Sequence, residues 1–323
     1  MHDISKPFVP AVRVCPVCGR DGQTNFLRAP DRFHGRTEQY SLVRCGSCSL
    51  VWLENPPEPE AMAQHYGDEY DKAISSVGER DLVGHWAEPR RTLLQHKSQG
   101  SLLDLGCSSG AFLASMRDPS WTLYGIEMSR PVAERARANS GADVFVGDVL
   151  DAPFTAGSFD AITCFHLFEH VHQPKKVLEK VWTWLKPGGV FLAYMPNIDS
   201  GAARFFGSYW YGLELPRHLY HYSPKSLREL AKATGFPEIN VTTHREPFVE
   251  RSTRYVAVDI LRKIGISLAP DSAAAEISFP WRVARKGLRL AVLPIINQLF
   301  GVAGPGEIMH AVLRKNDSID NEQ

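Results

Sequence analysis

The sequence has no excess of charge of one sign, no long apolar run and few cysteines, and each shortage excludes a class of protein. Its 323 residues carry 36 Lys and Arg against 36 Asp and Glu, so no net positive field would attract a polyanion. No stretch of about 18 uncharged apolar residues occurs, which argues against a membrane-spanning helix. Hydrophobic residues make up 44% and charged residues 22%, values that exclude disordered, collagen-like and disulfide-scaffold chains.

The first residues and the use of cysteine both point to the cytoplasm. Residues 1–7 lack the apolar run of a signal peptide, so we expect a cytoplasmic protein. Of the six cysteines, four stand as two close pairs, while Cys107 and Cys164 stand alone in apolar surroundings. In a reducing compartment, paired thiols indicate a metal site rather than disulfides.

Two C-x2-C pairs lie near the start of the chain, Cys15 with Cys18 and, after 26 intervening residues, Cys45 with Cys48. Each pair can direct two thiolates at one ion, and two pairs complete the tetrahedral set of four sulfurs that zinc prefers. The β-forming residues between the pairs predict the hairpin of a zinc ribbon. We therefore expect a structural zinc ion held by these four cysteines, rather than two chance pairs.

A stretch rich in Pro and Glu, residues 54–60, fits neither a helix nor a central strand and is taken as a domain boundary. We expect a zinc-ribbon module over residues 1–58 and a second domain over residues 59–323. Residues 61–97 have a helical pattern. Beyond them, short apolar runs alternate with amphipathic segments.

This alternation predicts an α/β fold with a doubly wound, mostly parallel, seven-stranded sheet, a Rossmann-like architecture. A helical insertion over about residues 246–304 should precede the last strand. The predicted strands cover 101–105, 122–127, 144–147, 161–165, 190–195, 239–243 and 306–315, and the predicted helices cover 111–117, 131–139 and 174–185.

The carboxyl ends of the first three predicted strands carry acids, and ligands of such sheets bind at those ends. Asp104 opens a turn in which Gly106 and Gly110 allow close approach of the backbone to a ligand. Glu127 lies 21 residues after Gly106, the offset at which a carboxylate can accept both hydroxyls of a ribose. Asp148 could accept from an adenine amine. Three acids without a loop that binds phosphate predict a site for an adenosine that carries a cation. The alternative is that each acid caps a following helix.

At these residues the sequence resembles the class I S-adenosylmethionine-dependent methyltransferases, in their first motif at 104–110, at Glu127 and at 147–148. Residues 158–160 and 185–189 are also similar to that family. The resemblance covers roughly residues 60–245 and resumes in the last strand. It implies S-adenosylmethionine as cofactor and a cofactor site comprising Asp104, Gly106, Ser108, Gly110, Glu127, Met128, Asp148, Val149 and Phe165. Ser108 stands where the family usually has glycine, which we expect to weaken packing without loss of binding.

In this family the loop after the fourth strand faces the methyl group, and here it contains His166, Glu169 and His170. A hydroxyl or carbon acid must lose a proton when it is methylated, and a positioned base adds about 10²–10⁴-fold to the rate. The predicted catalytic residues are these three and His218.

The H-x-x-E-H pattern of that loop leaves other interpretations open. On a helix it would be a protease zinc motif, which its place after a strand argues against. The core also resembles the quinone-biosynthesis O-methyltransferases, which bind a divalent metal through Glu-x-x-Glu-His. Glu169 and His170 match that motif, while His166 replaces the first Glu. Alternatively, Glu169 and His170 hold the loop in place by hydrogen bonds.

Aromatic residues are dense at 205–211 and 216–224, which include Trp210 and His218. They indicate either an acceptor pocket over the strand ends or a packed lid. The pattern resembles bacterial methyltransferases that carry a zinc knuckle in front of the catalytic domain.

Within the insertion, residues 281–293 place Arg282, Arg285, Lys286 and Arg289 on one helical face and apolar residues on another. This helix either covers the sheet with its charges in solvent, or makes a peripheral contact with the inner face of the membrane through residues 281–300.

The sequence thus predicts a methyltransferase that acts on a hydroxyl or carbon of a small-molecule, sugar or lipid-linked acceptor. One alternative is an RNA methyltransferase that grips nucleic acid with its zinc module. Residues 1–60 hold seven Lys and Arg against seven Asp and Glu, which argues against this alternative. A nicotinamide-dependent oxidoreductase is disfavoured by the missing G-x-G-x-x-G spacing. The last alternative is a non-catalytic scaffold that binds S-adenosylmethionine.

Overall fold

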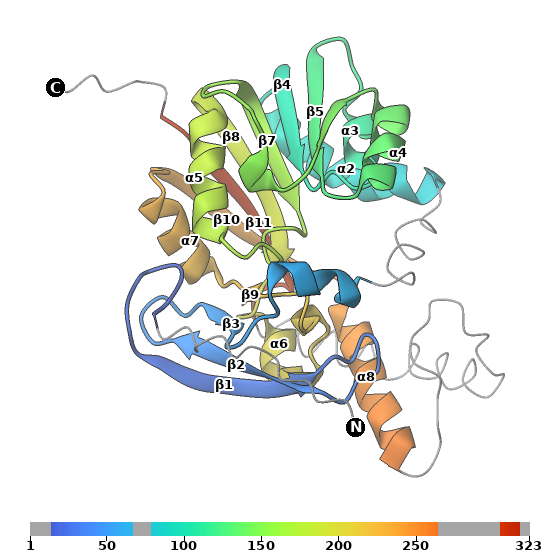
Figure 1. The fold of residues 1–323 in the computed structure, drawn as a ribbon, viewed down its shortest axis with the longest axis vertical. Helices are drawn as coiled ribbons and strands as arrows, with labels where there is room; N and C mark the ends of the chain where they lie inside the picture. Colours follow the sequence, from blue (N-terminus) through green and yellow to red (C-terminus); the bar gives the residue numbers. More distant parts are fainter. Residues whose placement is uncertain (1–13, 67–78, 264–303, 317–323) are drawn as a thin grey trace.

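Two sheets organise the chain, and one lies at the end of the other (Figure 1). The computed structural model describes residues 14–66, 79–263 and 304–316. The larger sheet has the strand order β10-β11-β8-β7-β4-β5-β6, and the smaller has the order β1-β2-β3-β9. The smaller sheet lies at the end of the larger one where β8 leads into α6, so it faces the carboxyl ends of the parallel strands.

The larger sheet confirms the predicted α/β fold, and each predicted strand lies within a few residues of an observed one. β4 to β8 are parallel, whereas β11 is antiparallel to both β8 and β10. The strands are β4 (Gly100–Leu105), β5 (Trp121–Glu127), β6 (Asp143–Val146), β7 (Phe159–Phe165), β8 (Leu185–Pro196), β10 (Glu238–His244) and β11 (Ile308–Arg314).

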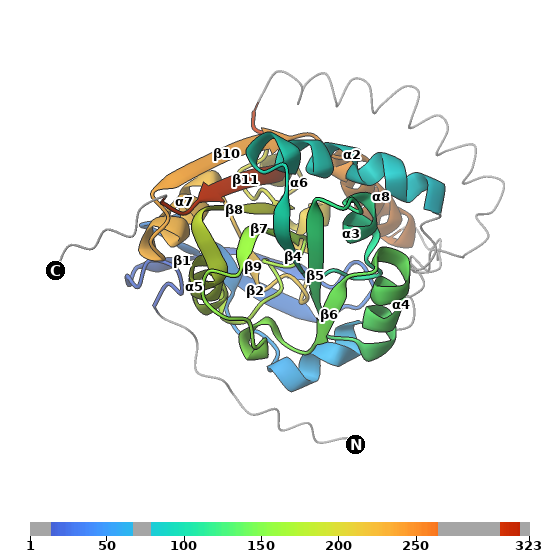
Figure 2. The ribbon, with the colours of Figure 1, turned by 90° about the horizontal axis from the view of Figure 1, so that it is seen from above.

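Helices cover both faces of this sheet, as Figure 2 shows: α2, α3 and α4 lie on one side, and α5 and α7 on the other. Proline in the first turn favours the starts of α4, α5 and α7, because its fixed φ suits that position. The helices are α2 (Glu79–His96), α3 (Ala111–Ser115), α4 (Arg130–Ser140), α5 (Pro174–Trp184), α6 (Gly201–Phe206), α7 (Pro224–Ala233) and α8 (Phe248–Lys263); 3-10 turns are η1 (Pro59–His65), η2 (Val149–Asp151), η3 (Gly207–Tyr209) and η4 (Tyr211–Leu213).

The hydrophobic core is divided by the sheet into two clusters. Successive residues of a strand point to opposite faces, so Leu102 packs in one cluster and Leu103 in the other, both with 0% of their surface exposed. Burial on both faces is the reason that the parallel strands read as continuous apolar runs in the sequence.

The smaller sheet contains the predicted zinc-ribbon hairpin, because β1 (Gln23–Pro30) pairs antiparallel with β2 (Gln39–Cys45). β3 (Val51–Leu53) extends it, and β9 (Tyr220–His221) joins as the fourth strand. The 3-10 turn η1 begins at Pro59, within the stretch predicted as a domain boundary. The boundary itself stays a prediction, but the smaller sheet takes strands from both sides of it.

The segments predicted as helical outside the sheet are described in part. α2 lies within residues 61–97, η1 overlaps the start of that range, and α8 begins the predicted insertion. Residues 281–300, the basic amphipathic helix of the sequence analysis, lie outside the described residues. Among the described helices, none is both long and apolar enough to cross a bilayer.

Candidate active site

The turn between β4 and α3 brings backbone amides to the carboxyl end of the sheet. Gly106, Ser108 and Gly110 have φ of 67°, 48° and 75°, all in the left-handed region. A Cβ on Gly110 would lie 2.8 Å from the carbonyl oxygen of Ala136 in α4, so only glycine fits there. Ser108 adopts a conformation that favours glycine, so a serine there carries backbone strain. The expected weaker packing without loss of binding stays a prediction.

Glu127, at the end of β5, is tied to this turn. Its Oε2 accepts a hydrogen bond from the amide of Ser108 at 3.1 Å, and its Oε1 accepts one from the amide of Ser129 at 2.9 Å. The carboxylate is thereby held across the ends of β4 and β5. The residue that caps α4 is Ser129, so Glu127 is not merely a helix cap.

Asp104 is a buried acid directly before the same turn, with 3% of its surface exposed. It accepts a hydrogen bond from Thr163 Oγ1 at 2.7 Å. Burial raises the pKa of its carboxyl to about 7, although the Thr163 hydroxyl opposes this shift. A carboxyl group in this state is stabilised in its charged form by any cation that binds beside it.

Asp148 follows β6 and caps η2, accepting from the amide of Leu150 at 2.7 Å. Asp148 therefore acts as a helix cap in this structure, whereas Asp104 and Glu127 do not. Of the remaining predicted cofactor residues, Val149 is buried, while Met128 is 68% exposed.

The end of β7 is packed by aromatic rings. Phe165 lies 4.7 Å from Phe112, 5.2 Å from Trp86 and 5.1 Å from Tyr194, measured between ring centroids. Trp86 comes from α2, so this helix closes over the strand end. The next residue, His166, has a φ of 53° and turns the chain into the predicted catalytic loop.

Glu169 is the most unusual residue of that loop. Only 1% of its surface is exposed, yet neither carboxylate oxygen has a hydrogen-bond partner in the described structure. Its Oε1 lies 3.6 Å from His166 Nδ1 and 4.0 Å from His218 Nε2. A buried polar group without a partner costs about 1–3 kcal/mol, which indicates that a ligand or a transferred proton completes this site.

Two histidines next to Glu169 are held by backbone carbonyls. His218 Nδ1 lies 2.9 Å from the Gly212 carbonyl oxygen, and His170 Nδ1 lies 3.1 Å from that of Arg217. A carbonyl oxygen can only accept, so we assign the proton to Nδ1 in both rings, and Nε2 keeps its lone pair. Burial lowers the pKa of both imidazoles to about 3, so both are neutral at pH 7.

Glu169, His170 and His218 each place one potential ligand atom within 4.8 Å of the others. The structure thus brings His218, rather than His166, into the set with Glu169 and His170. Such a set can hold a divalent cation or exchange protons with an acceptor. The exposed side-chain fraction of His166 is 48%, and it lies at the edge of this group.

Sequence reasoning missed two residues of this cluster. Tyr66, whose hydroxyl lies 3.0 Å from His170 Nδ1, is 104 positions away in the chain. Glu214 Oε2 lies 3.7 Å from His218 Nε2 and forms a 2.7 Å ion pair with Arg217. Glu214 has a φ of 35°, a conformation that no local pattern in the sequence predicts.

The aromatic stretch contributes to packing as well as to the site. Trp210 and Tyr222 are almost fully buried, which agrees with the interpretation of this stretch as a packed lid. Phe205, by contrast, is 64% exposed. Tyr211 packs against Phe248 of α8 at 5.2 Å between ring centroids.

The four paired cysteines converge as predicted. Cys15 Sγ lies 3.5 Å from Cys48 Sγ, and Cys18 Sγ lies 3.6 Å from Cys45 Sγ. All four sulfurs lie within 4.8 Å of one another, and none forms a disulfide. Tetrahedral zinc with bonds of about 2.3 Å separates its sulfurs by about 3.8 Å, so the set fits zinc.

The strand order, the antiparallel β11 and the acids at three adjacent strand ends define a Rossmann-like methyltransferase fold. The chain belongs to the methyltransferase domain family, whose model matches residues 79–240. S-Adenosylmethionine is the cofactor of this family.

The chain is similar to curated proteins named ubiquinone biosynthesis O-methyltransferase. It is 30% identical to that of Paraburkholderia xenovorans (strain LB400) over 152 residues, which are 43% of this chain and 66% of the relative. It is 29% identical to that of Thiobacillus denitrificans (strain ATCC 25259 / T1) over 169 residues, which are 49% of this chain and 71% of the relative. A solved S-adenosylmethionine-dependent methyltransferase from Thermotoga maritima aligns with a TM-score of 0.49 and 16% identity, covering 79% of this chain and 99% of that one.

Proposed function

We propose that the chain transfers the methyl group of S-adenosylmethionine to a hydroxyl, or to an acidic carbon, of a small-molecule, sugar or carrier-linked acceptor. The observation that carries this proposal is the buried, unpartnered carboxylate of Glu169 beside the neutral imidazole of His218. The relatives named as O-methyltransferases support oxygen as the first acceptor atom to test.

The cofactor site in this proposal is the edge of the sheet that carries the three acids. Glu127 is already oriented by two amides, and its carboxylate could accept the hydroxyl protons of a ribose. Asp148 keeps one oxygen beyond its cap for the adenine amine. Asp104 would face positive charge of the cofactor. The proposed cofactor residues are Asp104, Gly106, Ser108, Gly110, Glu127, Met128, Asp148, Val149 and Phe165.

When bound, S-adenosylmethionine supplies a methyl group made electrophilic by its sulfonium. The chain's own task is to remove the acceptor's proton and to hold the acceptor in line. In our proposal the proton moves to His218 Nε2, because Nδ1 already donates to the Gly212 carbonyl. The carboxylates of Glu169 and Glu214, at 4.0 and 3.7 Å, would stabilise the imidazolium that forms.

We also propose that Cys15, Cys18, Cys45 and Cys48 hold one structural zinc ion. The amides of Ser47 and Cys48 lie 3.3 and 3.4 Å from Cys45 Sγ, the donors that a metal-bound thiolate accepts from in a tight turn. Four sulfur ligands leave no open position, so the ion would stabilise the fold rather than take part in the reaction.

The test is methyl transfer from radiolabelled S-adenosylmethionine to a panel of phenols, sugars and prenyl-linked phenols. His218→Gln should lower the rate on an accepted substrate by at least 100-fold, while S-adenosylhomocysteine binds with unchanged affinity. His96→Gln, at the end of α2, is the matched control and should keep the wild-type rate.

Two results would overturn the proposal. Transfer to RNA but to no small acceptor would favour an RNA methyltransferase. A rate that depends on added Mg²⁺ or Mn²⁺ would show that Glu169, His170 and His218 act as metal ligands instead of as the base cluster.

A further inference from the structure

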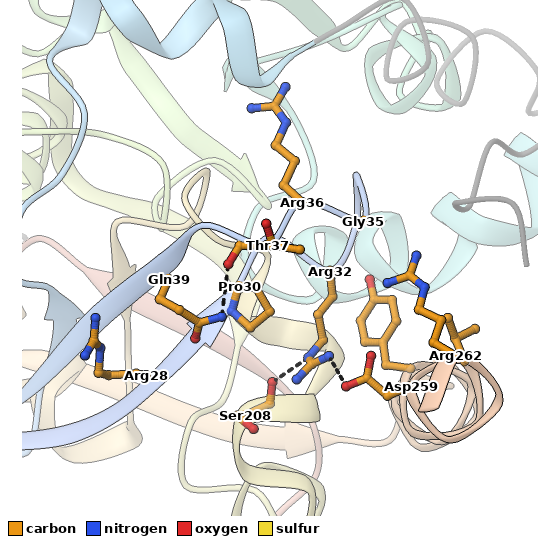
Figure 3. Close-up of a pocket in the computed structure, with 12 residues that line it drawn as sticks. Arg28, Pro30, Arg32, Gly35, Arg36, Thr37, Gln39, Ser208, Asp259 and Arg262 are labelled. Carbon is orange, nitrogen blue, oxygen red and sulfur yellow. Dashed lines mark hydrogen bonds and ion pairs between the residues drawn. The ribbon is translucent and has the colours of Figure 1, made fainter. Parts of the chain in front are cut away.

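A cavity of about 350 Å³ lies between β1, the loop that follows it and helix α8 (Figure 3). It is distinct from the cluster of Glu169 and His218, because none of the residues of that cluster lines it. Its walls are formed by Arg28, Pro30, Arg32, Gly35, Arg36, Thr37, Gln39, Ser208, Tyr255, Val258, Asp259 and Arg262.

The charge of this cavity is strongly positive. Its lining includes four arginines and a single carboxylate, Asp259. That carboxylate is already paired: Arg32 Nη1 lies 3.0 Å from Asp259 Oδ2, and Arg32 Nε donates to the Ser208 carbonyl at 3.1 Å. Figure 3 shows both contacts as dashed lines. The lining itself therefore supplies a carboxylate partner to only one of its four arginines.

These arginines are held in different ways. Arg36 Nη1 lies 3.1 Å from His65 Nδ1, and its Nε lies 3.9 Å from a carboxylate oxygen of Asp31. Among the described residues, no carboxylate oxygen lies within ion-pair distance of Arg28 or Arg262. Both side chains are exposed, so they can reach an anion in the cavity without breaking an existing ion pair.

One face of α8 forms a wall of the cavity. Tyr255, Val258, Asp259 and Arg262 follow one another at helical spacings of three, one and three residues, which places them on one face. The wall thus combines an aromatic ring and an apolar side chain with charge. A ligand that suits it carries an anionic group beside a less polar part.

Neighbouring side chains lead from the cavity to the proposed base. Tyr255 stacks on Tyr211 with ring centroids 6.0 Å apart, and burial together with the nearby negative charge of Glu214 raises the pKa of Tyr211. Glu214 Oε2 in turn lies 3.7 Å from His218 Nε2. Only two side chains therefore lie between a residue of the cavity wall and the proposed base.

We propose that this cavity binds the phosphate groups of a diphosphate ester, and that this ester is the methyl acceptor. The inference rests on the proposed function, whose substrate class it names. Guanidinium groups present paired donors that match phosphate oxygens. Arg28 and Arg262, which have no carboxylate oxygen within ion-pair distance among the described residues, supply two positive charges for a diphosphate. The volume of about 350 Å³ lies within the usual range for small-molecule sites.

The first experiment measures binding of inorganic pyrophosphate to the full, zinc-replete chain by calorimetric titration. The double variant Arg28→Gln/Arg262→Gln should weaken pyrophosphate binding by at least tenfold, and raised salt should weaken it in the wild type. Arg135→Gln, which removes an exposed arginine of α4, is the matched control and should leave the affinity unchanged. Asp259→Asn should strengthen binding, a direction that a merely damaged fold would not produce.

Two diphosphate esters then distinguish the source of the phosphate groups. UDP-glucose represents nucleotide sugars, and farnesyl diphosphate represents prenyl carriers; the one that binds at least tenfold tighter than pyrophosphate identifies the class. No binding of any of the three probes, or equal binding to the wild type and the double variant, would overturn the proposal. Affinity for S-adenosylhomocysteine is followed in parallel, so failure of this site can be told from failure of the proposed function.

Discussion

Trp52 and Tyr220 are paired residues of neighbouring strands, although 168 positions separate them. Trp52 belongs to β3, two strands from the β1 edge of the cysteine-bearing sheet, and Tyr220 follows His218 by two positions. The backbone amides of Leu219 and Tyr220 also donate to the Glu169 carbonyl, at 2.8 and 3.2 Å. The cysteine-bearing sheet is thus continuous with the segment that positions the proposed base.

This continuity predicts that loss of zinc affects catalysis as well as stability. Cys45→Ser should lower the melting temperature, because structural zinc contributes directly to folding. It should also lower the methyl-transfer rate more than it lowers S-adenosylhomocysteine affinity, since the smaller sheet includes β9 but none of the three acids. Thermal unfolding, titration and metal analysis check these outcomes.

A chelator provides the control for this prediction. It should lower the melting temperature of the wild type but produce no further change in the Cys45→Ser variant. Purified protein that contains no zinc, or a wild type that is indifferent to chelation, would contradict the zinc site.

Glu127 should control cofactor affinity. Glu127→Gln should weaken S-adenosylmethionine and S-adenosylhomocysteine binding by at least tenfold, because charge-assisted hydrogen bonds to the ribose would be lost. Glu134→Gln, on the exposed side of α4, is a control of the same chemistry and should bind normally. Equal affinity in both variants would remove Glu127 from the cofactor site.

Asp104 makes stability depend on pH. Its folded-state pKa is raised by burial to about 7, above the ordinary value of 3.8, so the folded state keeps a proton that the unfolded state releases. Stability from this residue is therefore present below pH 4 and is lost as the pH rises to 7. The difference amounts to about 4 kcal/mol at most. Asp104→Asn lacks this dependence. Between pH 4 and 7 the free energy of unfolding of the variant should therefore rise relative to that of the wild type.

Urea unfolding of both proteins at pH 5 and pH 8 measures this difference. Bound S-adenosylmethionine should reduce it, because a cation beside Asp104 favours the ionised carboxyl. Parallel pH profiles of the two proteins without cofactor would show that Asp104 titrates normally.

We expect that replacing Glu169 raises the stability of the protein and lowers its activity. Replacing it with Met removes a buried carboxylate that lacks hydrogen bonds, so the free energy of unfolding should rise by about 1–3 kcal/mol. The methyl-transfer rate should fall by at least 100-fold, since the imidazolium of His218 loses a carboxylate 4.0 Å away. Glu179→Gln, on α5, should change neither quantity by a measurable amount. A Glu169→Met protein that is less stable would mean that unseen hydrogen bonds satisfy this carboxylate.

Local patterns were sufficient to predict the strands and the acids at their ends. The parallel strands are buried on both faces, so they appear as apolar runs, and Asp104, Glu127 and Asp148 follow from where those runs stop. The cysteine pairs were equally predictable, because a two-residue spacing confines both thiolates to one turn.

Contacts between distant segments could not be predicted in this way. Nothing near Tyr66 in the sequence indicates that its hydroxyl reaches His170, and nothing near Glu169 indicates its approach to His218. The cavity of arginines is of the same kind, because β1 and α8 are more than 200 residues apart in the chain.

The sequence by itself therefore determined the class of fold, the four-cysteine set and the acids of the proposed cofactor site, because each depends on short spacings along one strand or turn. Only the tertiary structure decided which histidines meet Glu169, why β9 couples the cysteine-bearing sheet to His218 and where the arginines of the cavity gather. Those relationships depend on how distant segments pack, which is determined by the burial of the whole core rather than by any local pattern.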